Sequence, residues 1–278
     1  MKKTIKIILF SILTIALIFG FFILITVYPE LIMKNKIEYK NYRVYSTASI
    51  NNKMVNILEL IDNIVAKCPI YQPNINHRIF FYNENRFFKF IQEKLVRAPT
   101  FAPMYSLGNS KIQNIITFRP VDIENNRLIQ DENQKPYLTQ IIAHEIIHTF
   151  QNRINGDPEK IPFWKIEGYA EYWSDLNRDK TTFKTIALKA DLLRHQNLSW
   201  MKDKNGDFTP FGFEQIHESY FQDTAGNWYA GIYFVAHLMV QYVFEIRSID
   251  YDTFMSTDTK QNDILNEMFT WSENYSKL

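Results

Sequence analysis

The stretch "LTQIIAHEIIHTFQ", Leu138 to Gln151, holds two histidines four positions apart and a glutamate directly after the first. Apolar residues recur through it at the spacing of a helix face, which predicts an α-helix. Positions i and i+4 of a helix lie one turn apart on the same face, so His144 and His148 can direct both imidazoles at one point. Glu145 lies one residue further round the helix. This H-E-x-x-H pattern offers two neutral nitrogens to Zn²⁺ and a carboxylate for proton transfer.

A catalytic zinc site needs a third protein ligand and an open position for water. The stretch "IPFWKIEGYAEYWSDL" predicts a second helix beginning at Pro162, with 18 residues between His148 and Glu167. A helix, a short loop and an antiparallel helix would bring Glu167 beside the histidines. Glu171 comes one turn later on the same face, where it could accept the other ring N–H of a ligand histidine. The plainer interpretation is that these polar residues form ordinary solvated helix faces.

H-E-x-x-H followed after 18 residues by a glutamate resembles the gluzincin metallopeptidases, the clan of thermolysin and aminopeptidase N. The words "AHEIIHTFQ" and "IPFWKIEGYAEYWS" are similar to the peptidase MA-like bacterial proteins, which are membrane-linked or secreted. The similarity is close from Thr139 to Asp175 and extends to the rest in outline. It implies a zincin-like domain, in which residues of this chain take the following roles: His144, His148 and Glu167 as zinc ligands, Glu145 as general base, and Glu171 as the residue that orients a ligand histidine.

The same family usually has a tyrosine or histidine that donates to the developing oxyanion. The stretch "NWYAGIYFVAHL" resembles the start of a helix in aminopeptidase relatives, which makes Tyr229 the candidate, with Tyr233 and His217 as alternatives. The spacing from Tyr229 to Gly231 is shorter than in those relatives, and a packing role is the other interpretation of this tyrosine. No G-x-M-E-N segment precedes the zinc helix, so an endopeptidase is favoured over an aminopeptidase.

The N-terminus, "MKKTIKIILFSILTIALIFGFFILITVYPE", carries lysines at its start and then 21 uncharged residues from Ile7 to Val27. A bilayer core about 30 Å thick is crossed by about 20 helical residues, so this run is long enough to span it. A cleavable signal peptide would have an apolar region of about 7 to 15 residues and a small-x-small cleavage site. Residues 1–30 are therefore predicted to be an uncleaved transmembrane anchor, with the large domain outside the cytosol. A signal peptide and a buried core helix are the alternatives.

The remaining chain predicts an α+β domain over residues 51–278, joined to the anchor by a polar stalk over residues 31–50. A helix is expected from Met54 to Val65, a strand in "HRIFFYN", a helix in "ENRFFKFIQEKLV", and a strand from Lys111 to Phe118 that forms a cleft edge to which a peptide could add. The part of the chain after this strand is predicted to be mainly helical. The prediction is thus a small mixed sheet with the active-site helix, then a helical C-terminal subdomain. The further helices are expected over residues 162–177, 185–194, 228–246 and from 261.

The composition limits the classes of partner that the sequence predicts. Lys and Arg number 31 and Asp and Glu 30, and this balance gives no reason to expect nucleic acid. Cys68 is the single cysteine, which excludes an intrachain disulfide and a cysteine-ligated zinc site. The prediction is therefore a membrane-anchored, Zn²⁺-dependent peptidase acting on extracytoplasmic peptides or proteins. Two alternatives remain open: a zinc-binding or assembly module without catalysis, and hydrolysis of a bond other than a peptide.

Overall fold

The computed structural model describes residues 2–83, 100–102, 104–107, 110–117, 119–129, 137–155, 161–195, 220–222, 228–257 and 260–275. These residues form mostly helices with a small sheet, which confirms the predicted α+β class. The chain divides into two compact units, residues 1–62 with 72–146, and residues 63–71 with 147–278. The helix predicted over residues 84–96 lies outside the described residues.

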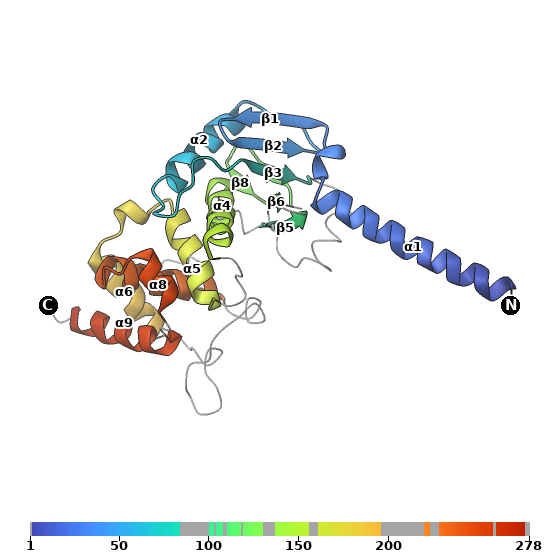
Figure 1. Ribbon diagram of the computed structural model, residues 1–278. Coiled ribbons are helices and arrows are strands. Elements are labelled where there is room, and N and C mark those ends of the chain that lie inside the picture. The colour runs from blue at the N-terminus through green and yellow to red at the C-terminus, as the bar shows by residue number, and fades with distance from the viewer. Residues whose placement is uncertain are drawn as a thin grey trace. The chain divides into compact units, whose positions relative to one another are not determined.

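A mixed sheet forms the centre of the first unit (Figure 1). Its first two strands run antiparallel, and β2, β3 and β6 run parallel to one another. Two short strands pair antiparallel with the outer side of β6. In sheet order the strands are β1 (Asn35–Tyr39), β2 (Tyr42–Ser46), β3 (His77–Phe81), β6 (Ser110–Thr117) and β4 (Thr100–Phe101), with β5 (Met104–Leu107) also on β6.

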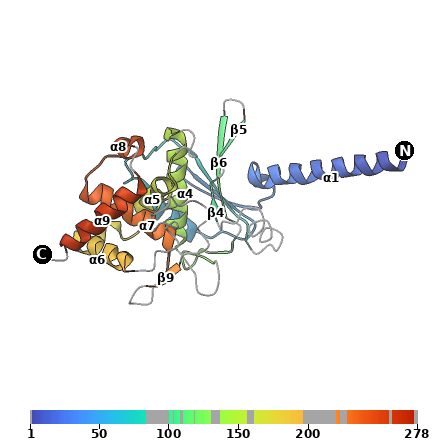
Figure 2. The ribbon, with the colours of Figure 1, turned by 90° about the horizontal axis from the view of Figure 1, so that it is seen from below.

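The strand predicted from Lys111 to Phe118 is confirmed as β6, but the prediction that a peptide could add to it is wrong for Asn114–Thr117. β3 pairs with Asn114–Thr117 on one side, while β5 and β4 pair with the other side. Figure 2 shows β5 lying along β6. An added peptide strand therefore could not pair with the Asn114–Thr117 part of β6, whose two sides are both taken by neighbouring strands.

Residues 31–50 were predicted to be a stalk, and the structure corrects this because β1 and β2 belong to the sheet. In β2 the side chains of Tyr42, Val44 and Ser46 are buried, whereas Arg43 is exposed. Only alternate residues of such a half-buried strand are inward, so its average composition resembles that of a polar linker. Only residues 27–34 therefore connect the N-terminal helix to these two strands.

The N-terminal helix α1 (Lys2–Thr26) ends beside the sheet. The carbonyl oxygen of Val27 accepts a hydrogen bond from Asn114 Nδ2 at 3.3 Å, and the Arg78 guanidinium pairs with Glu30. The described side chains of α1 from residue 5 to residue 21 are exposed, although most are apolar. Within the part of the chain that the structure describes, no helix reaches the length and hydropathy that crossing a membrane requires. The anchor over residues 1–30 stays a prediction.

Helix α2 (Lys53–Val65) confirms the helix predicted there from apolar spacing. Met54, Leu58 and Ile61 are fully buried on one face, as the i, i+4, i+7 pattern requires. The Asp62 carboxylate accepts a hydrogen bond from Tyr42 Oη at 3.1 Å, which ties α2 to the sheet. The helix thereby covers part of the apolar surface that the strands present.

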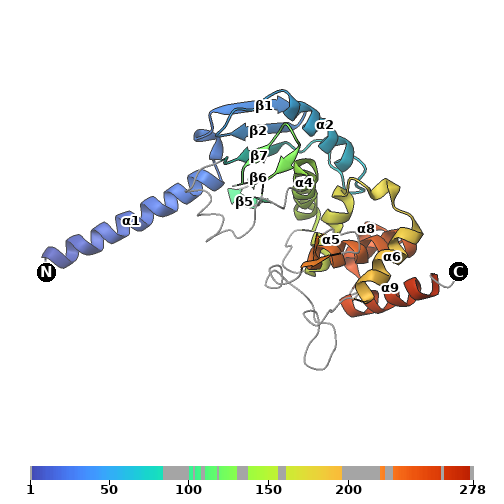
Figure 3. The ribbon, with the colours of Figure 1, turned by 180° about the vertical axis from the view of Figure 1, so that it is seen from behind.

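The second unit is built from packed helices. Helix α5 packs against α7. Helix α6 packs against α9, and Figure 3 shows this second pair side by side. The predicted helix from residue 228 begins later, at Gly231, because Trp228–Ala230 pair with β9 as the strand β10. Beyond α7 a π-helical turn covers Tyr242–Ile246. The elements of this unit are α5 (Phe163–Ser174), α6 (Phe183–Arg194), β9 (Tyr220–Gln222), β10 (Trp228–Ala230), α7 (Gly231–Gln241), α8 (Tyr251–Ser256) and α9 (Gln261–Tyr275), with a 3₁₀ turn at Arg178–Lys180.

Helix α4 (Leu138–Asn155) begins against a small hairpin formed by β7 (Val121–Asp122) and β8 (Arg127–Leu128). The turn residue Asn126 adopts a φ of 52°. Its Oδ1 accepts hydrogen bonds from Thr139 N at 3.0 Å and Thr139 Oγ1 at 2.8 Å, and its carbonyl accepts from Leu138 N at 3.0 Å. A residue distant in sequence thus supplies the cap for the free N–H groups of the helix's first turn.

Replacing Asn126 tests this cap. The Asp variant keeps the side-chain acceptor, the Gly variant loses it but tolerates the positive φ, and the Ala variant loses both advantages. We expect the free energy of unfolding to fall in that order, with the Ala variant destabilised by about 2 kcal/mol. Denaturant unfolding followed by circular dichroism measures the order. Equal stability of the Ala and Asp variants would show that the cap contributes nothing.

Candidate metal centre

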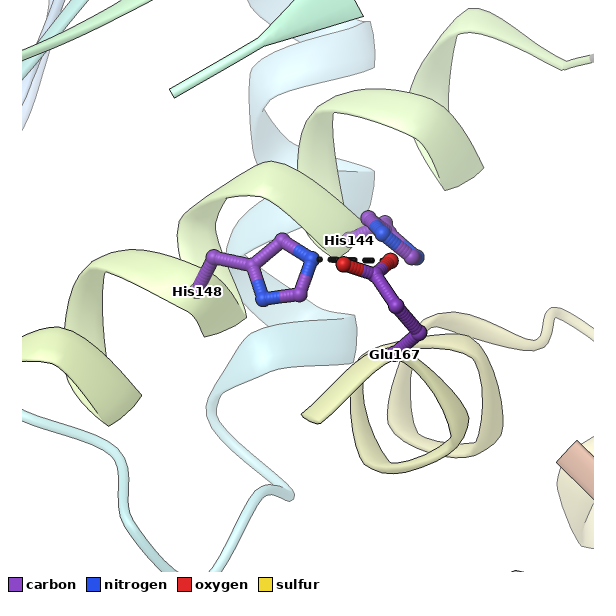
Figure 4. Close-up of side chains that lie close together, drawn as sticks. All are labelled: His144, His148 and Glu167. Atoms are coloured by element: carbon purple, nitrogen blue, oxygen red, sulfur yellow. Dashed lines mark hydrogen bonds and ion pairs between the residues drawn. The ribbon is translucent and has the colours of Figure 1, made fainter. Parts of the chain in front are cut away.

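His144, His148 and Glu167 come together as the sequence predicted (Figure 4). One ligand atom from each lies within 4.8 Å of the others, and His148 Nε2 is 3.3 Å from Glu167 Oε2. The two histidines lie one turn apart on α4, and Glu167 lies on α5. Glu167 is 7% exposed and the His148 side chain 13% exposed, so these polar groups meet inside the protein.

The group fits Zn²⁺ in donor type and in spacing. Two ligands that each lie about 2.0 to 2.1 Å from a tetrahedral zinc are about 3.3 to 3.4 Å apart. The distance of 3.3 Å between His148 Nε2 and Glu167 Oε2 matches that separation. Two imidazoles and one carboxylate are also the ligands of the catalytic zinc sites that leave one position open. The three side chains could therefore hold Zn²⁺ if their ligand atoms, which lie within 4.8 Å of one another, all moved to this separation.

The start of α5 is fixed by residues around Glu167. Pro162 occupies the N-cap position, and its carbonyl accepts a hydrogen bond from Lys165 N at 2.9 Å. The Lys165 side chain is 1% exposed, and its Nζ donates to the carbonyls of Phe254 at 2.5 Å and Thr257 at 2.6 Å. A cation is favourable there because the last carbonyls of α8 carry the negative end of the helix dipole. Sequence reasoning missed this contact, which joins residues 89 and 92 positions apart.

Glu145 lies next to His144 on α4 and is 8% exposed. Its position agrees with the predicted role of general base, and the role itself stays a prediction. Glu171 is partly buried on α5, and its negative charge acts on His237. The predicted hydrogen bond from a ligand histidine to Glu171 likewise stays a prediction.

Gln151 is a residue of the site that the sequence analysis missed. Its Oε1 lies 2.8 Å from His148 Nδ1, and its Nε2 donates to the Ile166 carbonyl at 3.1 Å. The signal that could have found it is spacing, because a residue three positions beyond His148 lies on the same helix face. The polar residue at that place is buried to 1% exposure, which an ordinary surface glutamine would not be.

The structure describes the three candidates for stabilising an oxyanion to different extents. The backbone of Tyr229 lies in β10, opposite Phe221 of β9, while its side chain lies outside the described residues. His217 also lies outside them. Tyr233 lies on α7, and its ring is 6.1 Å from the ring of Phe163 at the start of α5. The assignment of Tyr229 therefore stays a prediction.

Gly168, directly after Glu167, lies where the backbones of α5 and α7 are in close contact. A Cβ built on Gly168 would lie 2.4 Å from the Ala236 carbonyl oxygen and 2.7 Å from its carbon. No side chain fits between the two backbones there, because real Cβ contacts are not this short. Glycine at this position therefore allows α7 to hold α5, and with it Glu167, in place.

His237 lies on α7, with its ring 6.1 Å from that of Tyr172 on α5 and its Nε2 3.8 Å from Asp175 Oδ2. Burial lowers the pKa of His237, and the nearby Lys189 adds to that effect, while the charges of Asp175 and Glu171 oppose it. His77 and His195 are the other described histidines outside the pair on α4. Among the described residues these three do not join the group that could hold a metal.

Comparison with known proteins does not assign the chain to a family. Neither a scan against models of protein families nor a search of curated proteins found a match to the chain. The residues and distances of the site therefore carry the functional proposal.

Replacing Gly168 with Ala should disturb the metal centre through the fold. The added methyl must push α7 away from α5, and overpacking of this kind costs about 1 to 3 kcal/mol. We expect lower stability in denaturant unfolding and weaker Zn²⁺ binding. Gly20→Ala is the matched control, since a Cβ there has no heavy atom within 4 Å and should leave both properties unchanged. Equal behaviour of the two variants would contradict close packing at Gly168.

His237 predicts a dependence of stability on pH. Its pKa is lowered in the folded protein, so below the ordinary value of about 6.5 the unfolded chain binds a proton that the folded chain does not. This contribution to stability is present above pH 6.5 and is lost as the pH falls toward the lowered pKa. Measured between pH 7.5 and 5.5, the unchanged chain should lose more stability than His237→Gln, by up to about 1.4 kcal/mol per pH unit. The same loss in both proteins would rule out this role.

Proposed function

We propose that this protein is a zinc-dependent peptidase of the gluzincin type. The observation that carries the proposal is the meeting of His144, His148 and Glu167 within 4.8 Å, with the buried carboxylate of Glu145 on the same helix. The small mixed sheet followed by helices agrees with the zincin-like architecture that the resemblance implies. A structural zinc site would have no need of a base beside it, so Glu145 favours catalysis.

The residues of the site divide the chemistry of peptide hydrolysis between them. His144, His148 and Glu167 would hold Zn²⁺, which when bound supplies a Lewis acid and a water of lowered pKa. Glu145 would accept a proton from the attacking water and pass it to the leaving amine. Because Glu145 is 8% exposed, little bulk water competes for that proton, and electrostatic interactions are stronger than at the surface. Tyr229 is the proposed donor to the developing oxyanion.

We also propose that residues 1–30 anchor the chain in a membrane, with the catalytic domain outside the cytosol. The support is the uncharged run from Ile7 to Val27, which follows three lysines. Large apolar side chains of α1 face outward, with Phe10 71% and Ile15 67% exposed, and such a surface is unfavourable in water. Peptides or proteins outside the cytosol would then be the substrates, and an endopeptidase is favoured over an aminopeptidase.

Replacing Glu145 with Gln tests the proposal most cheaply. The amide keeps the shape of the side chain but cannot take a proton, so hydrolysis of a fluorogenic peptide library and of casein should fall by about 10²- to 10⁴-fold. The zinc content, measured by elemental analysis, should stay equal to that of the unchanged full-length chain. Glu59→Gln, at an exposed position of α2, is the control and should retain activity.

Three outcomes would contradict the proposal. Undiminished hydrolysis by Glu145→Gln would remove the base from the mechanism. Zinc binding without hydrolysis of any peptide by the unchanged chain would favour the alternative of a zinc-binding or assembly module. Cleavage of ester substrates alone would point instead to a hydrolase for a bond other than a peptide.

A further inference from the structure

Gln151 connects the two helices that carry the metal centre. It lies on α4 one turn after His148, and its side chain touches both a ligand and α5. We propose that Gln151 is a positioning residue: it fixes the tautomer of His148 and couples that ring to the α5 backbone beside Glu167. This inference rests on the proposed zinc function, because it concerns how the chain prepares a ligand for the metal.

The chain of hydrogen bonds begins at the Ile166 carbonyl, which can only accept. Its partner at 3.1 Å must therefore be the NH₂ group of Gln151, which leaves the amide oxygen facing His148. That oxygen lies 2.8 Å from His148 Nδ1 and can only accept, so Nδ1 must carry the proton. In the neutral ring the lone pair is then on Nε2. Nε2 is the atom that lies 3.3 Å from Glu167 Oε2, on the side where a metal would bind.

The opposite orientation of the amide is unfavourable at both ends. The Gln151 oxygen would face the Ile166 carbonyl oxygen, and two acceptors at that distance repel each other. The NH₂ group would face His148 Nδ1 and would favour the tautomer with a proton on Nε2. That tautomer cannot offer Nε2 to a metal. A backbone carbonyl of α5 thus selects the form of the imidazole on α4.

The same amide also holds two ligands at a fixed spacing. Ile166 directly precedes Glu167, so the hydrogen bond to its carbonyl restrains the backbone from which the ligand carboxylate projects. The bond to Nδ1 restrains rotation of the His148 ring. An outer partner of a ligand histidine usually contributes about 10- to 100-fold to metal affinity by this means.

A neutral amide suits this place better than the carboxylate that often partners a ligand histidine. Gln151 is 1% exposed, and burying an additional charge there would be costly. A carboxylate could accept from His148 Nδ1, but its second oxygen would face the Ile166 carbonyl without a proton to share. Leucine has a similar volume and can make neither bond. These two substitutions therefore separate the acceptor from the packing.

The test measures Zn²⁺ affinity rather than activity. The full-length chain, Gln151→Leu, Gln151→Glu and Gln241→Leu are stripped of metal and titrated with Zn²⁺ against a chromophoric chelator. We expect Gln151→Leu to bind Zn²⁺ about 10- to 100-fold more weakly. Gln151→Glu should retain most of the affinity, because it keeps the acceptor for Nδ1. Gln241→Leu removes another buried glutamine, on α7, and should bind Zn²⁺ like the unchanged chain.

The outcomes distinguish this inference from the function on which it rests. Absence of Zn²⁺ binding by the unchanged chain would refute the proposed function, and the inference with it. If the unchanged chain binds Zn²⁺ and Gln151→Leu binds it equally well, only the inference is wrong. Equal losses in Gln151→Leu and Gln151→Glu would show that the acceptor for His148 Nδ1 does not set the affinity, and would also overturn the inference. Visible absorption of bound Co²⁺ gives a second readout, since a reoriented His148 would change the spectrum even in a folded variant.

Discussion

The approach of the Glu167 carboxylate to the His148 imidazole, at 3.3 Å, is the interaction on which the candidate centre depends. Both groups are largely withdrawn from water, and Glu145 and Gln151 beside them are buried as well. Concentrating polar groups in this way lowers stability unless each has a partner. A divalent cation would neutralise the carboxylate and bind the imidazole lone pairs. Binding of such a cation would explain why these polar groups lie together inside the protein.

Residues outside the centre hold α4 and α5 so that this approach is possible. Asn126 caps the start of α4, and Lys165 ties the first turn of α5 to the end of α8. Gly168 lets the α7 backbone lie directly against α5. These three residues lie outside the group of His144, His148 and Glu167, yet each limits the movement of a helix that carries a proposed ligand. Catalytic geometry of this kind tolerates only small displacements, which explains why the support is so close-packed.

Sequence reasoning found the ligands because their spacing is local. His144 and His148 are four positions apart, which is about one helical turn, and the loop before the helix of Glu167 is short. It failed where the decisive contact is distant or depends on pairing. Residues 35–46 have the composition of a polar linker, and their place in the sheet depends on the pairing of β2 with β3. Whether β6 lies at an edge depends likewise on its pairing with β4 and β5. The polar contacts of Gln151 and Lys165 could not be inferred, since their partners are backbone carbonyls whose positions only the fold determines.

X-ray absorption at the zinc K edge of the full-length chain, loaded with one equivalent of Zn²⁺, tests the central claim most directly. The geometry predicts nitrogen and oxygen ligands at about 2.0 to 2.1 Å, with the outer-shell scattering of two imidazoles and no sulfur at about 2.3 Å. A chain that retains no zinc, or a spectrum without imidazole scattering, would contradict the assignment of His144, His148 and Glu167 as a metal centre.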